Sequence, residues 1–168
     1  MARSLIIVLF IFSLAHSSRA QDSLALSPSD STHSDTSLSG SIITYAKSLL
    51  GTTYVYGSKN PERGFDCSGF LYHVFTRHEV DVPRATSGWG DEGVEVPIAE
   101  ARPGDLLLFT GTDPSIRKPG HIGLVVSEAG APLEFIHSSS SRKHYGVVIT
   151  RYEGTGYPKR FLKVIRIL

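Results

Sequence analysis

The chain has one cysteine among its 168 residues, and this scarcity narrows what the thiol can do. A lone cysteine has no partner for a disulfide within the chain, so Cys67 serves in packing, in pairing with another molecule, or as a reactive group. Amide side chains are also scarce, because Asn60 is the only asparagine and Gln21 the only glutamine. An amide acting beside Cys67 would therefore have to come from the loop that precedes it.

Basic and acidic residues are nearly equal in number, so the chain has no strong net charge of either sign. The whole chain carries 17 basic and 16 acidic residues, a formal net charge of +1. Residues 1–20 contain Arg3 and Arg19 and no acid, so the remainder has 15 basic against 16 acidic residues, a net charge of −1. This balance gives no reason to expect nucleic acid or another polyanion as a partner.

Long hydrophobic runs are missing as well. The apolar run Leu5–Leu14 is too short to cross a bilayer, but its basic flank and the small residues after it fit a secretory signal peptide over residues 1–20. Residues 21–40 are rich in serine and poor in large apolar side chains, which predicts a disordered tether. We expect an exported protein, periplasmic or extracellular, with no transmembrane segment and one folded domain over residues 41–168.

Helical patterns come first in this domain and strand patterns later. Residues 42–50 have the apolar spacing of a helix that Gly51 would end, and a second helical pattern begins at Cys67. Apolar strands with turns between them follow at 106–109, 122–126, 133–137, 146–150 and 161–167. The order predicts an α+β domain in which N-terminal helices pack on a mainly antiparallel sheet.

Cys67 stands on the first turn of its predicted helix. Asp66 can cap this helix by accepting hydrogen bonds from its free backbone N–H groups. The helix N-terminus favours thiolate over thiol, and its unpaired N–H groups point to where an oxyanion can form. A small buried core residue is the competing interpretation, because free cysteine is among the most buried residue types.

Histidine is the usual base for a cysteine nucleophile, because its pKa lies near neutral pH. His121 and His137 stand at the ends of two neighbouring strands and are the best candidates. A three-residue loop over residues 128–130 would place His121 directly opposite His137, and Gly123 opposite Phe135. Opposed residues share one face with Cβ atoms about 5 Å apart, which suits a hydrogen bond between the two imidazoles.

The other histidines are less suitable, because they lie in the signal peptide, in the tether, on the helix of Cys67 itself or in a polar loop: His16, His33, His73, His78 and His144. Cys67, His121 and His137 are also ligand types that suit zinc. The close-spaced ligand pairs typical of zinc sites are missing, so we expect no metal and no cofactor.

Five segments resemble the NlpC-type cell-wall cysteine peptidases. They occur in the order and rough spacing of that family, and the resemblance covers residues 41–168: 65–70, 82–86, 103–109, 120–125 and 135–138. The resemblance implies a compact papain-like fold in which Cys67 is the nucleophile, His121 the base and His137 the residue that orients the base. It also implies hydrolysis of peptidoglycan stem peptides, often between D-glutamate and a diamino acid, and we expect a monomer.

Other residues receive candidate roles from their places near these motifs. Tyr54 corresponds to a family tyrosine near the cysteine, with Tyr56 as a substitute because the loop on to Cys67 is slightly longer here. Asp66 and Ser68 are candidates for contacts to substrate or oxyanion. Trp89, flanked by glycines, either lines the substrate groove or packs in the core.

Arg84 and Asp105 are expected to fix turns through charge-assisted hydrogen bonds.

Two other function classes remain open. A Cys and His pair on the same scaffold can also act as an amidase or an acyltransferase. An inactive peptidoglycan-binding module is the third class, and it is weakened because Cys67 and His121 are both present.

Overall fold

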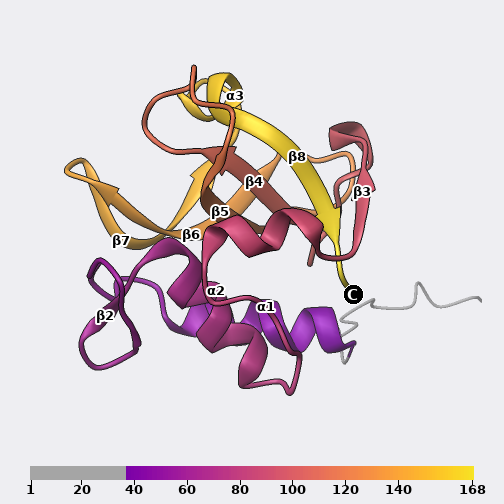
Figure 1. Ribbon diagram of the computed structural model, residues 1–168. Helices are drawn as coiled ribbons and strands as arrows, with labels where there is room; N and C mark the ends of the chain where they lie inside the picture. The colour runs from indigo at the N-terminus through magenta and orange to yellow at the C-terminus, as the bar shows by residue number, and fades with distance from the viewer. Residues whose placement is uncertain (1–36) are drawn as a thin grey trace, which may run out of the picture. The chain divides into compact units, whose positions relative to one another are not determined.

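The computed structural model describes residues 37–168 (Figure 1). Two helices, α1 (Leu38–Ser48) and α2 (Cys67–Thr76), precede a six-stranded sheet whose pairings are all antiparallel. The α+β prediction is thus confirmed. The predicted signal peptide and residues 21–36 of the predicted tether lie outside the described residues. Within the described part, no helix has both the length and the apolar character needed to cross a membrane.

Helix α1 begins at Leu38, three residues before the predicted start of the folded domain at Ser41. Ser37 has an extended backbone, and its side-chain oxygen accepts a hydrogen bond from the N–H of Gly40 at 3.1 Å. The predicted boundary at residue 40 is therefore too late for this helix. A serine that composition assigned to a tether acts as the N-cap, because serine is among the best residues at that position.

The sheet has the strand order β3-β8-β4-β5-β6-β7. Its strands are β3 (Val94–Val96), β4 (Leu106–Thr110), β5 (Pro119–Val125), β6 (Glu134–Ser141), β7 (His144–Arg151) and β8 (Phe161–Arg166). The five predicted strands are present. The 3-10 turn η1 (Thr86–Asp91) lies in a segment whose sequence is compatible with one helical turn. The sequence did not predict the other short elements, which have too few residues to show a period: β1 (Lys59–Asn60), β2 (Gly64–Phe65), β3, α3 (Tyr157–Arg160) and the 3-10 turn η2 (Ile98–Glu100).

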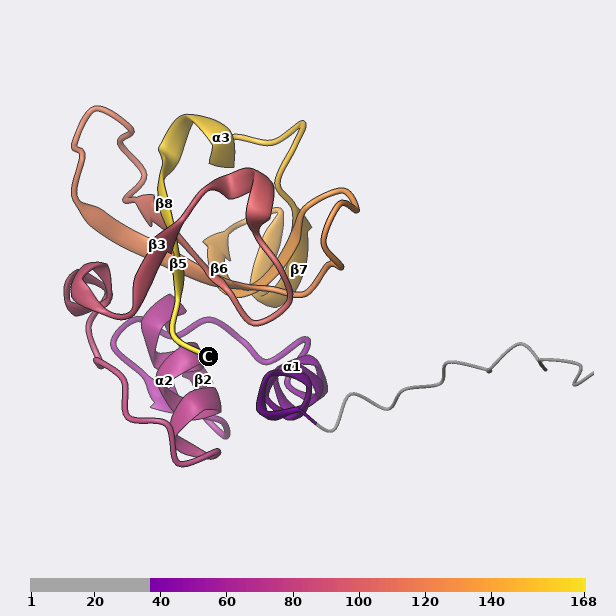
Figure 2. The same ribbon diagram turned by 90° about the vertical axis from the view of Figure 1, so that its right-hand side faces the viewer.

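Alternate residues of the central strands face two separate cores. Helices α1 and α2 lie on one side of the sheet and α3 lies on the other (Figure 1 and Figure 2). Leu106 and Leu108 of β4 join the core that contains α1 and α2, while Leu107 and Phe109 join the second core. All five residues of β4 are buried, as the uninterrupted apolar run predicted for a strand inside a sheet.

The pairing of β5 with β6 differs from the predicted register. Val125 pairs with Phe135 and Leu124 with Ile136, so the prediction that His121 directly opposes His137 is wrong by two residues. The connection is longer than three residues, since the N–H of Val126 donates to the carbonyl of Glu134 at 2.9 Å. A shift of two residues keeps every side chain on its face of the sheet, because the side-chain period of a strand is two.

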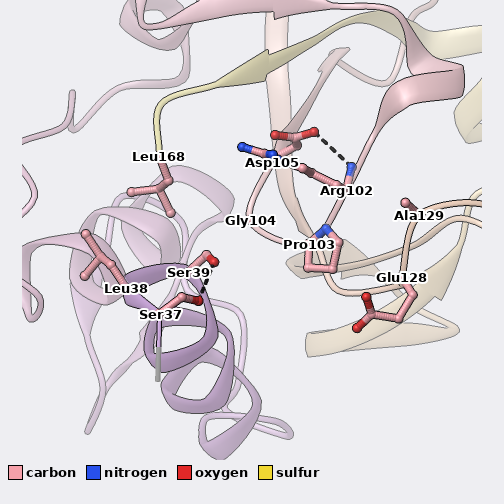
Figure 3. Close-up of a pocket in the computed structure, with 10 residues that line it drawn as sticks. All are labelled: Ser37, Leu38, Ser39, Arg102, Pro103, Gly104, Asp105, Glu128, Ala129 and Leu168. Carbon is pink, nitrogen blue, oxygen red and sulfur yellow. Dashed lines mark hydrogen bonds between the residues drawn. The ribbon is translucent and has the colours of Figure 1, made fainter. Parts of the chain in front are cut away.

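Asp105 ties the start of β4 to the end of β8. Its carboxylate oxygens each accept a hydrogen bond of 2.8 Å from Arg166, and one also accepts from the N–H of Arg102 at 2.9 Å. Only 1% of Asp105 is exposed. The expected role of Asp105 in fixing a turn is confirmed. A cavity of about 540 Å³ lies beside this turn, against the start of α1, and no residue predicted for the site lines it (Figure 3).

We expect Asp105→Asn to lower the free energy of unfolding by about 3 kcal/mol, because it leaves the Arg166 guanidinium without its buried counter-charge. Glu95→Gln is the matched control, since the ion pair of Glu95 with Lys163 is 3.5 Å long and the Glu95 side chain is 64% exposed. That change should cost less than about 1 kcal/mol. Urea unfolding at pH 7 measures both values, and equal losses would contradict the structural role of Asp105.

Candidate active site

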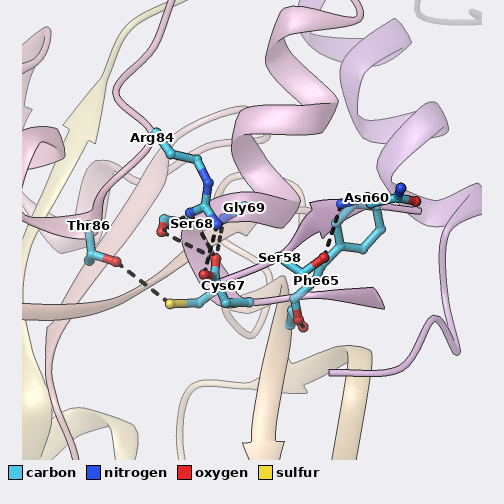
Figure 4. Close-up of polar contacts among 10 residues, drawn as sticks. Ser58, Asn60, Phe65, Cys67, Ser68, Gly69, Arg84 and Thr86 are labelled. Carbon is cyan, nitrogen blue, oxygen red and sulfur yellow. Dashed lines mark hydrogen bonds and ion pairs between the residues drawn. The ribbon is translucent and has the colours of Figure 1, made fainter. Parts of the chain in front are cut away.

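The carboxylate of Asp66 fixes the start of α2, where Cys67 is the first helical residue. One oxygen accepts a hydrogen bond from the N–H of Gly69 at 2.6 Å, as the predicted N-cap requires. Arg84 donates to both carboxylate oxygens, at 3.1 and 2.9 Å (Figure 4). The cap is therefore held in place by a two-pronged ion pair, and the expected role of Arg84 is confirmed.

Gly69 allows the preceding loop to pack against this helix start. A Cβ on residue 69 would collide with the carbonyl oxygen of Ser58 and would lie 2.8 Å from the carboxylate of Asp66. The N–H of Asp66 donates to the same Ser58 carbonyl at 3.0 Å. Any larger residue at position 69 would therefore displace the segment that carries Cys67.

Cys67 is 9% exposed, and its sulfur lies 3.7 Å from the hydroxyl oxygen of Thr86 (Figure 4). Burial raises the pKa of this thiol and the charge of Asp66 adds to the rise, while hydrogen bonds from Thr86 and from the backbone at Ser68 and Ile122 lower it. The net shift is upward. The prediction that this position favours the thiolate is wrong in direction, because burial outweighs the hydrogen bonds at the helix start.

His121 and His137 form the expected hydrogen bond between imidazoles. Nε2 of His121 lies 2.9 Å from Nδ1 of His137, and the two ring planes are perpendicular. Nε2 of His137 lies 2.9 Å from the hydroxyl of Thr150. Three strands, β5, β6 and β7, thus contribute one polar side chain each to a continuous chain of hydrogen bonds.

Gly123 makes room for this pair. A Cβ at this position would collide with the ring of Phe135 and would lie 3.3 Å from Cβ of His137. The space that a side chain at position 123 would fill is therefore occupied by Phe135 and His137.

Aromatic rings enclose the histidine pair. The ring of Tyr157 stacks on His121 with a centroid distance of 5.7 Å, and Phe135 lies 4.8 Å from the ring of His137. His121 is 8% exposed and His137 is 1% exposed. This burial lowers the pKa of His121 well below its usual value, with a further contribution from His137, and lowers the pKa of His137 to about 3. Both imidazoles are therefore uncharged at neutral pH.

Strand β5 carries His121 toward Cys67, because Pro119 and Gly120, the two residues before His121, line the cavity that opens at Cys67. A backbone hydrogen bond at Ile122, the residue after His121, is among the influences that lower the pKa of the thiol. Nε2 of His121 is used in the bond to His137, so Nδ1 is the ring nitrogen that remains for a proton donor. A thiol, an uncharged imidazole and an orienting second imidazole are the groups needed for nucleophilic attack assisted by a base.

A cavity of about 410 Å³ opens at Cys67 and is lined by Tyr54 and Tyr56. Tyr56 is 89% exposed, whereas Tyr54 is half-buried. Burial raises the pKa of Tyr54, and the neighbouring Cys67 and Asp66 raise it further, so its phenol keeps its proton. Of the two tyrosines, Tyr54 is the more enclosed, and it keeps its phenol proton.

Three further predicted residues lie as follows. The side chains of Asp66 and Ser68 line the same cavity, and both contact Arg84 in the cap. Trp89 is fully buried, packs its ring against Phe75 and does not line this cavity. The prediction that Trp89 lines the substrate groove is therefore wrong. The alternative prediction, that Trp89 packs in the core, is confirmed, because η1 turns the indole inward.

The remaining candidates are elsewhere. Nε2 of His73 bonds the hydroxyl of Tyr45 at 2.9 Å, and the amide oxygen of Asn60 accepts from backbone N–H groups in its own turn. Within residues 37–168, no three His, Cys, Asp or Glu side chains are grouped to hold a metal ion. The zinc alternative therefore finds no support in the donor geometry.

Sequence reasoning missed Thr86, Thr150 and Tyr157. Thr86 belongs to the segment 82–86, which was noted for its resemblance but not for a contact to the thiol. Thr150 is the last residue of a predicted strand, and Tyr157 lies on a four-residue helix. Neither position has a local signal, because its partner histidine comes from another part of the chain.

Comparison with known proteins gives a consistent result. The model of the NlpC/P60 family matches residues 51–166. The chain is 33% identical over 116 residues to the gamma-DL-glutamyl hydrolase of Bacillus subtilis, covering 69% of this chain and 26% of that protein. It is also 33% identical over 123 residues to the probable endopeptidase NlpC of Escherichia coli, covering 72% of this chain and 73% of that protein.

A solved structure shows the same fold. The crystal structure of an NlpC/P60 family protein from Bacillus cereus superposes with a TM-score of 0.66 and 27% identity, over 77% of this chain and 40% of that one. Several curated relatives are longer than this chain, which spans between 13% and 37% of their lengths.

Stability should fall as the pH is lowered below about 6.5, the pKa of histidine in the unfolded chain. His137 has its folded-state pKa near 3, so between pH 6.5 and 3 the unfolded state binds a proton that the folded state excludes. Full stability is present above this window, and the loss at pH 5 is about 2 kcal/mol for one such histidine. Urea unfolding at pH 7.5 and pH 5 measures it.

His137→Gln should remove one histidine's share of this pH dependence. His144→Gln replaces an exposed imidazole and removes only the last of the three influences that lower the pKa of His137, after burial and Arg160, so it should leave most of the dependence in place. A pH dependence that survives His137→Gln unchanged would contradict the buried, uncharged state of this ring.

Proposed function

The chain belongs to the NlpC/P60 family, and on this premise we propose that it is a cysteine peptidase that hydrolyses peptidoglycan stem peptides. The observation that carries the proposal is the chain of hydrogen bonds from His121 through His137 to Thr150, on a strand whose preceding residues Pro119 and Gly120 line the cavity at Cys67. Cys67 is the nucleophile, His121 the base and His137 the residue that orients the base. No cofactor takes part.

The proposed role of His121 as a base requires one tautomer for each ring, with the proton of His121 on Nε2. An uncharged imidazole carries a single N–H, so His121 donates from Nε2 only if Nδ1 of His137 accepts. His137 then carries its proton on Nε2 and donates it to the Thr150 hydroxyl. This arrangement leaves Nδ1 of His121 with a lone pair that takes the proton of Cys67 as the sulfur attacks.

The reaction then follows from these positions. The sulfur of Cys67 bonds the carbonyl carbon, His121 gives its proton to the leaving amine, and the C–N bond breaks to leave a thioester. Water, deprotonated by His121, attacks the thioester and restores the thiol. The backbone N–H groups at the start of α2 and the protonated phenol of Tyr54 stabilise the negative oxygen of the intermediate.

The names of two relatives support a D-glutamyl bond as the point of cleavage. One is the gamma-DL-glutamyl hydrolase and the other a gamma-D-glutamyl-L-lysine dipeptidyl-peptidase, both of Bacillus subtilis. We therefore place the scissile bond between D-glutamate and the diamino acid. A substrate in the cell wall requires export, so we propose that the monomer acts in the periplasm or outside the cell, after removal of residues 1–20.

Purified protein incubated with peptidoglycan fragments should release products whose masses fit cleavage after D-glutamate. Cys67→Ala should abolish this release while keeping the fold, since it removes the nucleophile and little else. Release of an intact stem from the sugar would instead identify an amidase. Binding of fragments without any product would favour the inactive binding module.

Thr150→Val should lower kcat about tenfold with little change in KM, because it removes the acceptor that holds the tautomer of His137. Thr150→Ser is the matched control and should retain most of kcat, since it keeps the hydroxyl. The proton path above fails if the valine variant turns over as fast as the serine variant.

A further inference from the structure

A second cavity, of about 420 Å³, lies along β7 and shares no lining residue with the cavity at Cys67. We call it the β7 cavity. Residues of β6, of β7 and of the segment 154–157 line it. β7 is an outer strand of the sheet, and on the edge away from β6 its Val147 exchanges backbone hydrogen bonds with Gly51 and Thr52.

The β7 cavity borders the histidine pair. Thr150, which lines it, bonds Nε2 of His137 at 2.9 Å, and Tyr157, which also lines it, stacks on the ring of His121. Ser139 lines it two residues after His137 on β6, so the two side chains point to the same face. The cavity is thus the continuation of the site on the histidine side.

The lining is basic and lacks acids. Lys143, His144 and Arg151 line the cavity together with hydroxyl groups of serine, threonine and tyrosine, and no Asp or Glu does so. Within residues 37–168, the ion pairs shorter than 4.0 Å involve none of these three basic residues. Arg151 stands opposite Glu134 across the strands without forming such a pair. Cationic groups without a carboxylate partner next to hydroxyl donors suit a carboxylate ligand.

The proposed reaction indicates which portion of the substrate lies near the β7 cavity. In the proposed function, His121 gives its proton to the leaving amine, so the amine portion of the substrate lies on the histidine side. The β7 cavity borders His121 through Tyr157, whereas the cavity at Cys67 is left for the acyl portion. The leaving portion of a stem peptide starts with the diamino acid, which in diaminopimelate carries a carboxylate on its side chain.

We propose that the β7 cavity binds a free carboxylate on the leaving side of the substrate and so selects stem peptides with diaminopimelate over their amidated forms. This inference rests on the proposed function for the identity of the substrate. Lys143 and Arg151 supply the charge, and the hydroxyl groups supply directed hydrogen bonds. An amide in place of the carboxylate loses the charge attraction while keeping its size.

The test measures binding without turnover. Cys67→Ala protein is titrated by calorimetry with γ-D-glutamyl-diaminopimelate and with the same dipeptide amidated on the side-chain carboxyl group. We expect the free acid to bind about tenfold more tightly than the amide, and the difference to shrink as salt is raised from 50 to about 500 mM.

Added substitutions locate the effect. Lys143→Gln with Arg151→Gln should remove the preference for the acid, while Arg142→Gln, which changes a neighbouring exposed cation outside the cavity, should keep it. Thermal unfolding of each variant checks that the fold is retained. The proposal is overturned by equal binding of acid and amide, by a preference that survives the double substitution, or by no binding of the acid at millimolar concentration.

Failure of the proposed function is a separate result. If the wild-type protein binds the acid with the stated preference but cleaves no stem peptide, the proposal for the β7 cavity stands and the peptidase assignment is contradicted. If the protein instead cleaves the acid and the amide substrates at equal kcat/KM and binds them equally, the peptidase assignment is kept and the proposal for the β7 cavity is lost.

Discussion

The carboxylate of Asp66 is the interaction on which the site depends. It caps α2 by accepting a hydrogen bond from the N–H of Gly69, and both of its oxygens accept hydrogen bonds from Arg84, a residue 18 positions further along the chain. Because Cys67 is the next residue, this one carboxylate fixes both the direction of the helix and the position of the sulfur. The loop from Ser58 packs against the same point, and Gly69 is required there because no side chain fits.

Burial is the second determinant, and it acts on charge. The thiol and both imidazoles are placed where desolvation disfavours their ionised forms, so the pKa of Cys67 rises and those of His121 and His137 fall. The resting site holds uncharged partners instead of a thiolate and an imidazolium. The proposed proton transfer then takes place during attack, and the helix start and Tyr54 act on the charge that develops on the substrate oxygen.

The sequence predicted the features that local patterns encode. The cap at Asp66, the helix after it, the apolar strands and the choice of His121 and His137 all follow from residues close together in the chain. The register of β5 on β6 did not, because it depends on the conformation of a longer loop than Gly130 suggested. Trp89 was ambiguous, since flanking glycines do not tell which way an indole turns. Thr150 and Tyr157 were missed because each meets its histidine through tertiary contacts that no local period records.

The hydrogen-bond chain from His121 to Thr150 crosses three adjacent strands, and this makes the imidazoles part of the sheet's own framework. Neither ring can rotate without breaking a contact to a neighbouring strand. β7, which supplies the last hydroxyl, pairs with β6 along its whole length, and on its other edge Val147 exchanges backbone hydrogen bonds with Gly51 and Thr52. The strand that ends the chain of imidazoles is therefore held from both sides. The segment directly after α1 thus supports the histidine pair from a distance, although it contacts neither ring in this chain of bonds.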